Sequence, residues 1–290
     1  MSLPEIAAFG DYETPDGVLI VGIPVGVGQL TGYHASPAGT PRGTVLFVPG
    51  FTGSKEDFRT FLPLLAAQGW DAWAYSQRGQ ADSAGPEGVE NYALELFASD
   101  VLEVAAVVGN GARVHLVGHS FGGIVAPEAV MTGPAAFLSL TLLCSGPHGW
   151  PGRHSDTTAT VAEAGSIGLW NRDNPHTVGV ADELLTEDEA FLRLRAARTK
   201  SENLLAGAEI LRTHSDKSGD IAGTGLPVLI AHGEDDEAWP TDWQRAMAAR
   251  MGAGYAVIPG GAHSPQVEAP AATAVVLDRF WAEHPATSIP

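Results

Sequence analysis

Short apolar runs alternate with amphipathic patterns along most of the chain from about residue 44 onward. Continuous apolar runs are typical of parallel strands buried on both faces, whereas apolar residues at three- and four-residue steps are typical of helices. The runs predict strands over residues 44–48, 71–75, 113–117, 138–144, 227–231 and 255–258. The stepped patterns predict helices over residues 54–68, 94–108, 239–251 and 270–283, and a further helix that opens at Ser120. Such alternation indicates parallel strands with helices on both faces, which is an α/β fold.

The segment before residue 44 shows a different pattern. Residues 17–35 (GVLIVGIPVGVGQLTGYHA) are rich in glycine, read as β-like and carry no helical periodicity. We expect this segment to form an antiparallel hairpin at the edge of the sheet.

A second departure lies between Pro147 and Ile221, where no convincing strand pattern is present. Proline, glycine and histidine dominate its first third, and helical patterns follow. An insertion of ~75 residues is too long for an ordinary connection in a compact domain. The sequence therefore predicts a helical cap, or lid, over residues 147–221, inserted in a core domain made of residues 1–146 and 222–290.

The charge balance limits the classes of partner. The chain has 34 acidic and 16 basic residues, which gives a formal net charge of -18. Such a surface repels phosphate backbones and anionic lipid, so we expect no nucleic-acid partner, and it mildly disfavours polyanionic substrates. No apolar run approaches the ~20 residues that span a bilayer, and no signal peptide is visible, so the expected location is cytoplasmic. A lone cysteine, Cys144, cannot form an internal disulfide and is interpreted as a buried structural thiol.

Residues 118–122 (GHSFG) form a G-x-S-x-G motif between a predicted strand and a predicted helix. A sharp strand-to-helix turn would push the Ser120 side chain out of the sheet, and glycine suits the crowded flanking positions. The amides at the start of the next helix would point toward a developing negative charge. Because the chain contains 35 glycines, the motif alone is weak, and its place between strand and helix carries the prediction.

Two later loops contain the partners that a serine nucleophile needs. His263 follows the last predicted strand and could take the proton from the Ser120 hydroxyl. Residues 232–240 (HGEDDEAWP) follow the strand before it and contain four acids, one of which could accept from the His263 ring. The residue types alone do not choose among these acids, and at least two of them are expected to be solvated.

The order serine, acid, histidine is the one that G-x-S-x-G hydrolases use. Here the chain resembles the α/β-hydrolases, and is most similar to the bacterial branch of monoacylglycerol-lipase-like esterases and cofactor-free haloperoxidase-like enzymes. The resemblance implies the α/β-hydrolase fold, with a mostly parallel eight-stranded sheet flanked by helices and a helical cap insertion. It implies that Ser120 is the nucleophile and His263 the general base. The family's acid commonly stands three residues after the loop glycine and four before a proline, which selects Asp236 over Asp235.

Two more segments resemble family features. Residues 48–54 (VPGFTGS) resemble the oxyanion loop, with Pro49 in place of the usual histidine. The resemblance implies that the backbone N–H groups of Phe51 and Phe121 form the oxyanion hole. Residues 75–83 (YSQRGQADS) resemble the D-x-R-G-x-G-x-S turn of the family, which we interpret as structural.

The predicted activity is cleavage of a carboxylic ester by a serine hydrolase, either a carboxylesterase or an enzyme like monoacylglycerol lipase. The predicted substrate is a small molecule with an apolar acyl group, because the residues expected near the site are largely apolar. The expected substrate-binding residues are Phe51, Thr52, Phe121 and Trp239, with His148 and Trp150 at the mouth of the cap.

Three alternatives stay open. A C–C bond hydrolase would use the same triad, and so would a cofactor-free haloperoxidase or perhydrolase. A non-catalytic ligand-binding protein on the same fold is the third, although such proteins often lose a triad member. No cofactor is expected, and no metal site is expected because His148, His154 and His176 lack ligand-like spacing.

Overall fold

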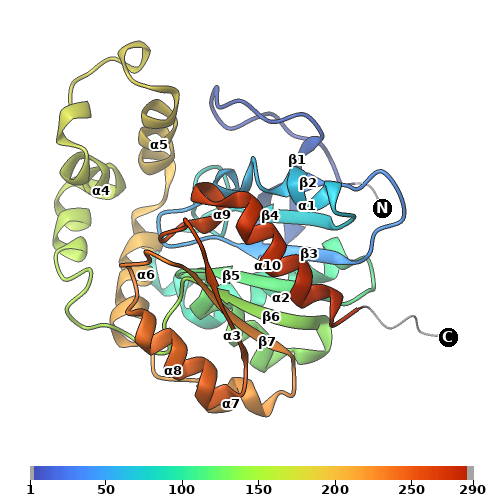
Figure 1. Cartoon of the computed structure of the whole chain (residues 1–290). Coiled ribbons are helices and arrows are strands. Elements are labelled where there is room, and N and C mark those ends of the chain that lie inside the picture. The colour runs from blue at the N-terminus through green and yellow to red at the C-terminus, as the bar shows by residue number, and fades with distance from the viewer. Residues whose placement is uncertain (1–2, 286–290) are drawn as a thin grey trace.

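An eight-stranded sheet forms the centre of the computed structural model, which describes residues 3–285 (Figure 1). The strand order is β1-β2-β4-β3-β5-β6-β7-β8. β1 and β2 form an antiparallel hairpin, β2 pairs antiparallel with β4, and all other pairs are parallel. The strands are β1 (Val18–Val25), β2 (Gly28–Ala35), β3 (Thr44–Val48), β4 (Asp71–Tyr75), β5 (Val114–His119), β6 (Phe137–Leu143), β7 (Val228–Gly233) and β8 (Gly254–Ile258). The predicted mostly parallel eight-stranded sheet, with its hairpin at the edge, is confirmed.

Helices cover both faces of the sheet and enclose one apolar core on each side. The helices of this layer are α1 (Leu62–Ala67), α2 (Leu94–Gly109), α3 (Gly122–Thr132), α8 (Thr241–Met251), α9 (Pro265–Glu268) and α10 (Pro270–Ala282). α1 and α10 pack on one face, and α2, α3 and α8 pack on the other. Short 3-10 helices connect them at Lys55–Phe58, Val89–Tyr92 and Pro134–Ala136. The predicted covering of the sheet by helices is therefore confirmed.

Two predicted helices differ from those observed. The single helix expected over residues 54–68 is wrong, because the chain forms the 3-10 turn Lys55–Phe58 and then starts α1 at Leu62. Pro63 lacks an N–H group for a continuous helix and is tolerated only in the first turn of a new one. The helix expected from residue 239 begins at Thr241, since Trp239 precedes Pro240 and such residues avoid the helical region.

Between β6 and β7 the described chain contains helices and no strand. The helices are α4 (Thr157–Asp173), α5 (Glu187–Arg198), α6 (Ser201–Thr213) and α7 (Ser218–Gly223), with 3-10 turns at Pro175–Thr177 and Asp182–Leu184. α4 and α5 project to one side of the sheet (Figure 1). Val161, Leu169 and Leu204 form a small apolar cluster there, against which Phe51 of the β3–α1 loop packs. We call the chain between β6 and β7 the insertion.

The N-terminal segment holds the insertion from outside. The Tyr12 ring stacks on that of Phe191 in α5, with centroids 4.1 Å apart, and the Tyr12 hydroxyl donates to Asp188 at 2.5 Å.

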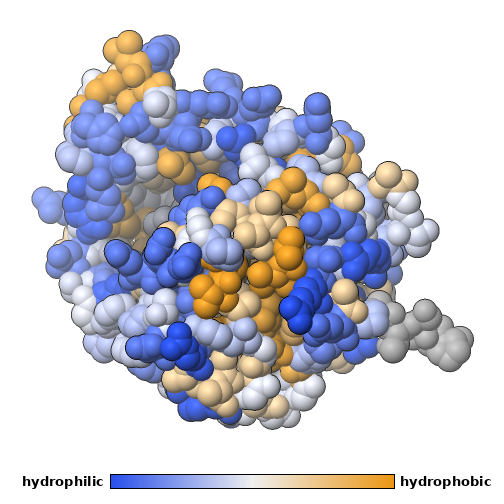
Figure 2. All heavy atoms as spheres, viewed as in Figure 1, coloured by the Kyte–Doolittle hydropathy of each residue, from blue (hydrophilic) through white to orange (hydrophobic). Residues whose placement is uncertain are grey.

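Apolar side chains gather over α9 and α10 on the face shown in Figure 2, where Val267 and Val275 are exposed. Within the described residues, no helix has both the length and the apolar character needed to cross a membrane.

Candidate active site

Ser120 lies on the turn between β5 and α3, and its backbone is held in the left-handed region with φ of 53°. A residue other than glycine is strained in this region and stays there only when its surroundings fix it. Close backbone contacts explain the flanking glycines. A Cβ on Gly118 would lie 2.2 Å from the carbonyl oxygen of Gly122, and one on Gly122 would lie 2.2 Å from that of Val48. The G-x-S-x-G motif therefore gives the tight turn that presents Ser120 to a cavity.

His263 lies between Ser120 and Asp236, although the three residues are far apart in the sequence. Its Nε2 is 3.0 Å from Ser120 Oγ, and its Nδ1 is 3.0 Å from Asp236 Oδ1. The loops after β5, β7 and β8 carry these residues, and parallel strands bring their carboxyl ends to the same edge of the sheet. With the proton on Nδ1, His263 donates to Asp236 and leaves Nε2 free to accept from the Ser120 hydroxyl. This arrangement can activate a serine nucleophile.

The environment of Asp236 separates it from the acids beside it. Asp236 is buried, whereas positions 234, 235 and 237 are exposed. Burial alone would raise the pKa of the Asp236 carboxyl, but hydrogen bonds from His263, the Ala238 amide and Gln244 outweigh it, so the pKa lies below its ordinary value. The carboxylate is therefore ionised at neutral pH and oriented toward the imidazole.

The loop after β3 passes beside Ser120, since a Cβ on Gly50 would lie 3.4 Å from Ser120 Cβ. Gln80 Nε2 donates to the Gly50 carbonyl at 2.8 Å, and Gln77 Nε2 donates to the Pro49 carbonyl at 3.0 Å. Within residues 3–285, the backbone N–H groups of Phe51 and Phe121 donate to no other group of the chain. Both amides are thus available to an oxygen bound next to Ser120.

His119, the residue before Ser120, fixes the loop that carries His263. Its Nε2 lies 2.7 Å from the backbone carbonyl of His263, to which it donates. Burial, followed by the charge of the neighbouring His263, lowers the pKa of His119 to about 4, so the ring is neutral at neutral pH. No local sequence pattern indicates this contact, because the two residues meet only through the fold.

Among the described residues, ligand atoms of His119, Cys144 and His263 lie within 4.8 Å of one another, so these three side chains form a group that could hold a metal. Burial raises the pKa of the Cys144 thiol well above its ordinary value. A thiol binds a metal as the thiolate, so this shift opposes binding. His119 Nε2 and His263 Nδ1 are also engaged in hydrogen bonds. The chemistry of the group fits a metal poorly.

Ser120 and His263 line a cavity of about 360 Å³ between the carboxyl edge of the sheet and the insertion. Three of the predicted substrate-binding residues, Phe51, Thr52 and Trp239, also line it. Phe121 lies behind Phe51, with ring centroids 6.3 Å apart.

His148 and Trp150, expected at the mouth of the cap, do not line this cavity. Their rings instead pack on Trp243 of α8, at centroid distances of 4.6 Å and 5.4 Å. They belong to an aromatic cluster that joins the start of the insertion to the core, because α8 presents a large apolar ring there.

The cavity wall also has a charged part, which was not predicted from the sequence. Arg153, Arg172 and Arg195 of the insertion line it, together with Asp57 and Asp173. Apolar side chains of Leu169, Leu211 and Val267 complete the wall. No local pattern marks these arginines, because only the folding of the insertion over the sheet brings them to Ser120.

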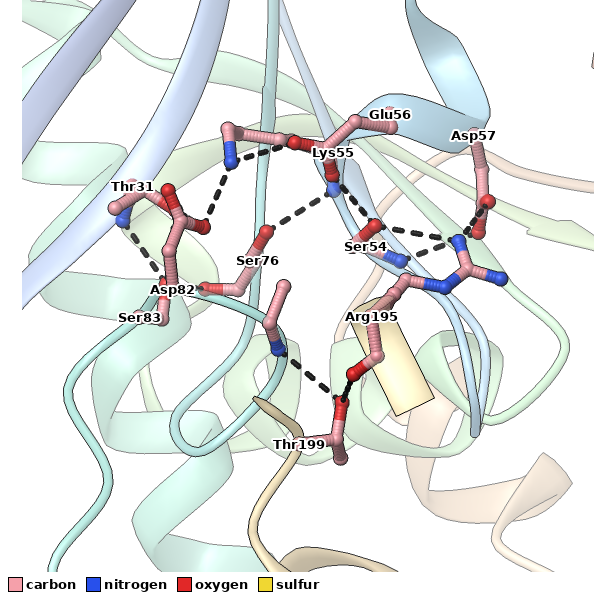
Figure 3. A network of polar contacts seen from close by, with 11 residues as sticks. Thr31, Ser54, Lys55, Glu56, Asp57, Ser76, Asp82, Ser83, Arg195 and Thr199 are labelled. Atoms are coloured by element: carbon pink, nitrogen blue, oxygen red, sulfur yellow. Dashed lines mark hydrogen bonds and ion pairs between the residues drawn. The ribbon is translucent and has the colours of Figure 1, made fainter. Parts of the chain in front are cut away.

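A polar network connects the wall of this cavity to the core (Figure 3). Arg195 of α5 donates to Ser54 Oγ at 3.2 Å and to Asp57 Oδ1 at 2.5 Å. Ser54 Oγ in turn donates to Glu56 at 2.6 Å, and Glu56 pairs with the buried ammonium of Lys55 at 2.7 Å. The insertion is therefore attached to the loop that carries Phe51.

The turn of residues 75–83 has the structural role that its pattern indicates. Arg78 forms a buried two-bonded pair with Asp100, with both N–O distances at 2.7 Å. The Ser83 hydroxyl donates to the Ser76 carbonyl at 2.7 Å and accepts from the Thr31 amide at 2.9 Å. These contacts fix the turn against β2 and α2.

Residues 45–276 match the sequence model of the family described as the alpha/beta hydrolase family. A pimeloyl-[acyl-carrier protein] methyl ester esterase of Methylococcus capsulatus is 31% identical over 175 residues, which cover 54% of this chain and 64% of that esterase. The match thus spans less than two thirds of that relative. A protein of Variovorax paradoxus with the provisional name carbamate hydrolase RutD is 28% identical over 262 residues, which cover 85% of this chain and 94% of that protein.

Among solved structures, a thermophilic esterase from Thermogutta terrifontis superimposes with a TM-score of 0.73. It is 19% identical, and the match covers 91% of this chain and 99% of that chain. At this identity the likeness shows a shared fold, and the fold by itself does not choose a reaction.

Proposed function

The chain belongs to the alpha/beta hydrolase family, and we propose that it is a serine hydrolase that cleaves carboxylic esters through an acyl-enzyme. The observation that carries the proposal is the pair of 3.0 Å contacts that connect Ser120, His263 and Asp236 at the wall of one cavity. A buried, ionised carboxylate, an imidazole and a strained serine in this order form the arrangement that acyl transfer requires.

The first half of the proposed reaction forms the acyl-enzyme. His263 Nε2 takes the proton from the Ser120 hydroxyl as Oγ attacks the ester carbonyl carbon. The carbonyl oxygen becomes an oxyanion, which the N–H groups of Phe51 and Phe121 bind. The imidazolium, stabilised by Asp236, then gives its proton to the leaving alcohol, and the C–O bond to that alcohol breaks.

The second half returns the enzyme to its starting state. His263 takes a proton from water, whose oxygen attacks the acyl carbon. A second oxyanion forms at the same two amides and collapses with release of Ser120 Oγ, which regains its proton from His263. The carboxylic acid then leaves the cavity. No external cofactor is needed for either half.

For the substrate we propose a small ester whose acyl part packs on the apolar wall formed by Phe51, Leu169, Leu211, Trp239 and Val267. We further propose that residues 147–221 act as a cap over the site, since residues of α4, α5 and α6 form part of the wall of the cavity beside Ser120. Residues 1–146 and 222–290 would then form the core domain, apart from residues 1–2 and 286–290, which lie outside the described residues. C–C bond hydrolase and perhydrolase chemistry would use the same three side chains, and profiling with the corresponding substrates separates them.

Labelling with a fluorophosphonate probe tests the nucleophile. The wild-type protein is expected to be labelled, and Ser120→Ala is expected to abolish labelling because the phosphonate bonds to the activated hydroxyl. Ser264→Ala is the matched control, since Ser264 lines the same cavity without a hydrogen bond from its hydroxyl to His263. Equal labelling of wild type and Ser120→Ala, or no labelling of the wild type, would refute the proposal.

A further inference from the structure

The cavity beside Ser120 is cationic in a chain that is strongly acidic. Three of the 16 lysines and arginines, Arg153, Arg172 and Arg195, line it, although the chain carries a net charge of -18. Two acids, Asp57 and Asp173, line the same wall, so the cavity carries one more positive than negative charge. This wall therefore offers cationic partners to an anionic group, although the chain as a whole is acidic.

Two of the three arginines already have carboxylate partners. Arg195 pairs with Asp57 at 2.5 Å, and Arg172 pairs with Asp173 at 2.7 Å and 3.1 Å. Arg153 differs, because its guanidinium forms no ion pair or hydrogen bond within residues 3–285. A guanidinium has five donors and no acceptor, so the N–H groups of the half-buried Arg153 remain available to a ligand.

The Arg153 side chain is nevertheless held in place. Its guanidinium lies over the indole of Trp150 at 5.4 Å from the ring centroid, and the Arg153 amide donates to the Trp150 carbonyl at 2.9 Å. Trp150 in turn packs on Trp239, a wall residue, and on Trp243. A cation fixed by an aromatic stack, with its donors unused, is arranged to bind rather than to stabilise the fold.

No free negative charge from the neighbouring side chains neutralises Arg153. His154, the next residue, contacts the Phe51 ring at 5.0 Å, and burial followed by the charges of Arg153 and Arg172 lowers the pKa of its imidazole to about 4. His154 is therefore neutral at neutral pH. Burial lowers the pKa of the Arg153 guanidinium, and the charge of the Asp236 carboxylate, which is hydrogen-bonded to His263, opposes that shift.

We propose that Arg153 forms an anion subsite in this cavity and that the preferred ester carries a carboxylate group that pairs with it. The inference rests on the proposed ester hydrolysis and specifies its substrate class. A planar carboxylate matches the two-pronged geometry of a guanidinium, and the apolar wall accommodates the chain between the carboxylate and the scissile ester. A monoester of a dicarboxylic acid meets these requirements.

Matched chromogenic esters test the subsite. Mono-p-nitrophenyl adipate and p-nitrophenyl hexanoate have acyl chains of the same carbon number and differ in the terminal carboxylate. The wild type is expected to have the higher kcat/KM toward the adipate ester. Arg153→Gln is expected to lower that value about tenfold to a hundredfold, as for loss of a charged hydrogen bond, and to change the hexanoate value less than about twofold.

Two further variants make the result specific. Arg198→Gln removes the same charge from an exposed position outside the cavity, and it should leave both esters unchanged. Arg153→Lys keeps the charge but loses the two-pronged geometry, so it should retain only part of the preference. All assays need one ionic strength, because salt screens a partly exposed pair. An equal effect of Arg153→Gln on both esters, or no wild-type preference, would overturn the subsite.

Adipate binding, measured by isothermal titration calorimetry, separates failure of this inference from failure of the proposed reaction. If the subsite exists, adipate binds the wild type at least about tenfold more tightly than Arg153→Gln, whether or not any ester is cleaved. Equal adipate affinity would overturn the subsite. Loss of fluorophosphonate labelling concerns only the Ser120 assignment.

Discussion

Lys55 offers a direct test of how much the buried ion pairs of the polar network contribute to stability. Its side chain is fully buried, and its ammonium lies 2.7 Å from both Glu56 Oε1 and Asp82 Oδ1 (Figure 3). Lys55→Met keeps the apolar stem and removes the charge. It leaves the buried Glu56 carboxylate and the less buried Asp82 carboxylate without their cation.

The structure limits the size of the expected effect. Removing one partner of a buried ion pair typically destabilises a protein by about 3–5 kcal/mol. Asp82 keeps a hydrogen bond from Thr31 at 2.6 Å and its side chain is 20% exposed, while Glu56 keeps the Ser54 hydroxyl. Both remaining contacts reduce the loss, so we expect Lys55→Met to lower the free energy of unfolding by about 3 kcal/mol.

Equilibrium unfolding in urea, followed by circular dichroism and tryptophan fluorescence, measures this loss. The double variant Lys55→Met/Glu56→Gln contains one buried charge fewer and should recover about 1–2 kcal/mol of it. Lys200→Met is the matched control, because its ion pair with Glu87 is exposed and should not shift the midpoint measurably. A loss below about 1 kcal/mol for Lys55→Met, or strict additivity in the double variant, would refute the reasoning.

Two further predictions concern the acid of the triad and a buried histidine. Asp236→Asn should lower kcat by roughly a thousandfold to ten-thousandfold, since an amide does not hold the required His263 tautomer. Asp235 is exposed, so Asp235→Asn should keep a kcat near that of the wild type. The reverse order of effects would identify Asp235 as the triad acid. Burial lowers the pKa of His115 to about 3, so the unfolded chain binds its proton below about pH 6.5 while the folded state does not. The His115 contribution to stability is therefore complete above that value and falls by about 2 kcal/mol between pH 7 and pH 5, and His115→Leu should remove this part of the pH dependence in melts at both pH values.

Local patterns predicted most of the sheet because its strands are buried and read as continuous apolar runs. The strands at residues 44–48 and 71–75 have the predicted bounds. The prediction of a single helix over residues 54–68 was wrong, because periodicity alone does not show that a new helix begins next to Pro63. The acid of the triad could be predicted only from the loop spacing typical of the family, because four neighbouring acids share the same local pattern and differ only in their burial.

The sequence by itself determined the elements, their alternation and the loops in which Ser120, Asp236 and His263 lie, because each depends on neighbouring residues and on strand order. Only the tertiary structure decided what else meets at those loops. In the tertiary structure His119 lies against the His263 carbonyl. His148 and Trp150 lie in an aromatic cluster, and Arg153 lines the cavity. The last two of these features join residues of the insertion to the core, and no periodicity records how an insertion packs over a sheet, since that depends on side-chain shape and charge across the whole interface.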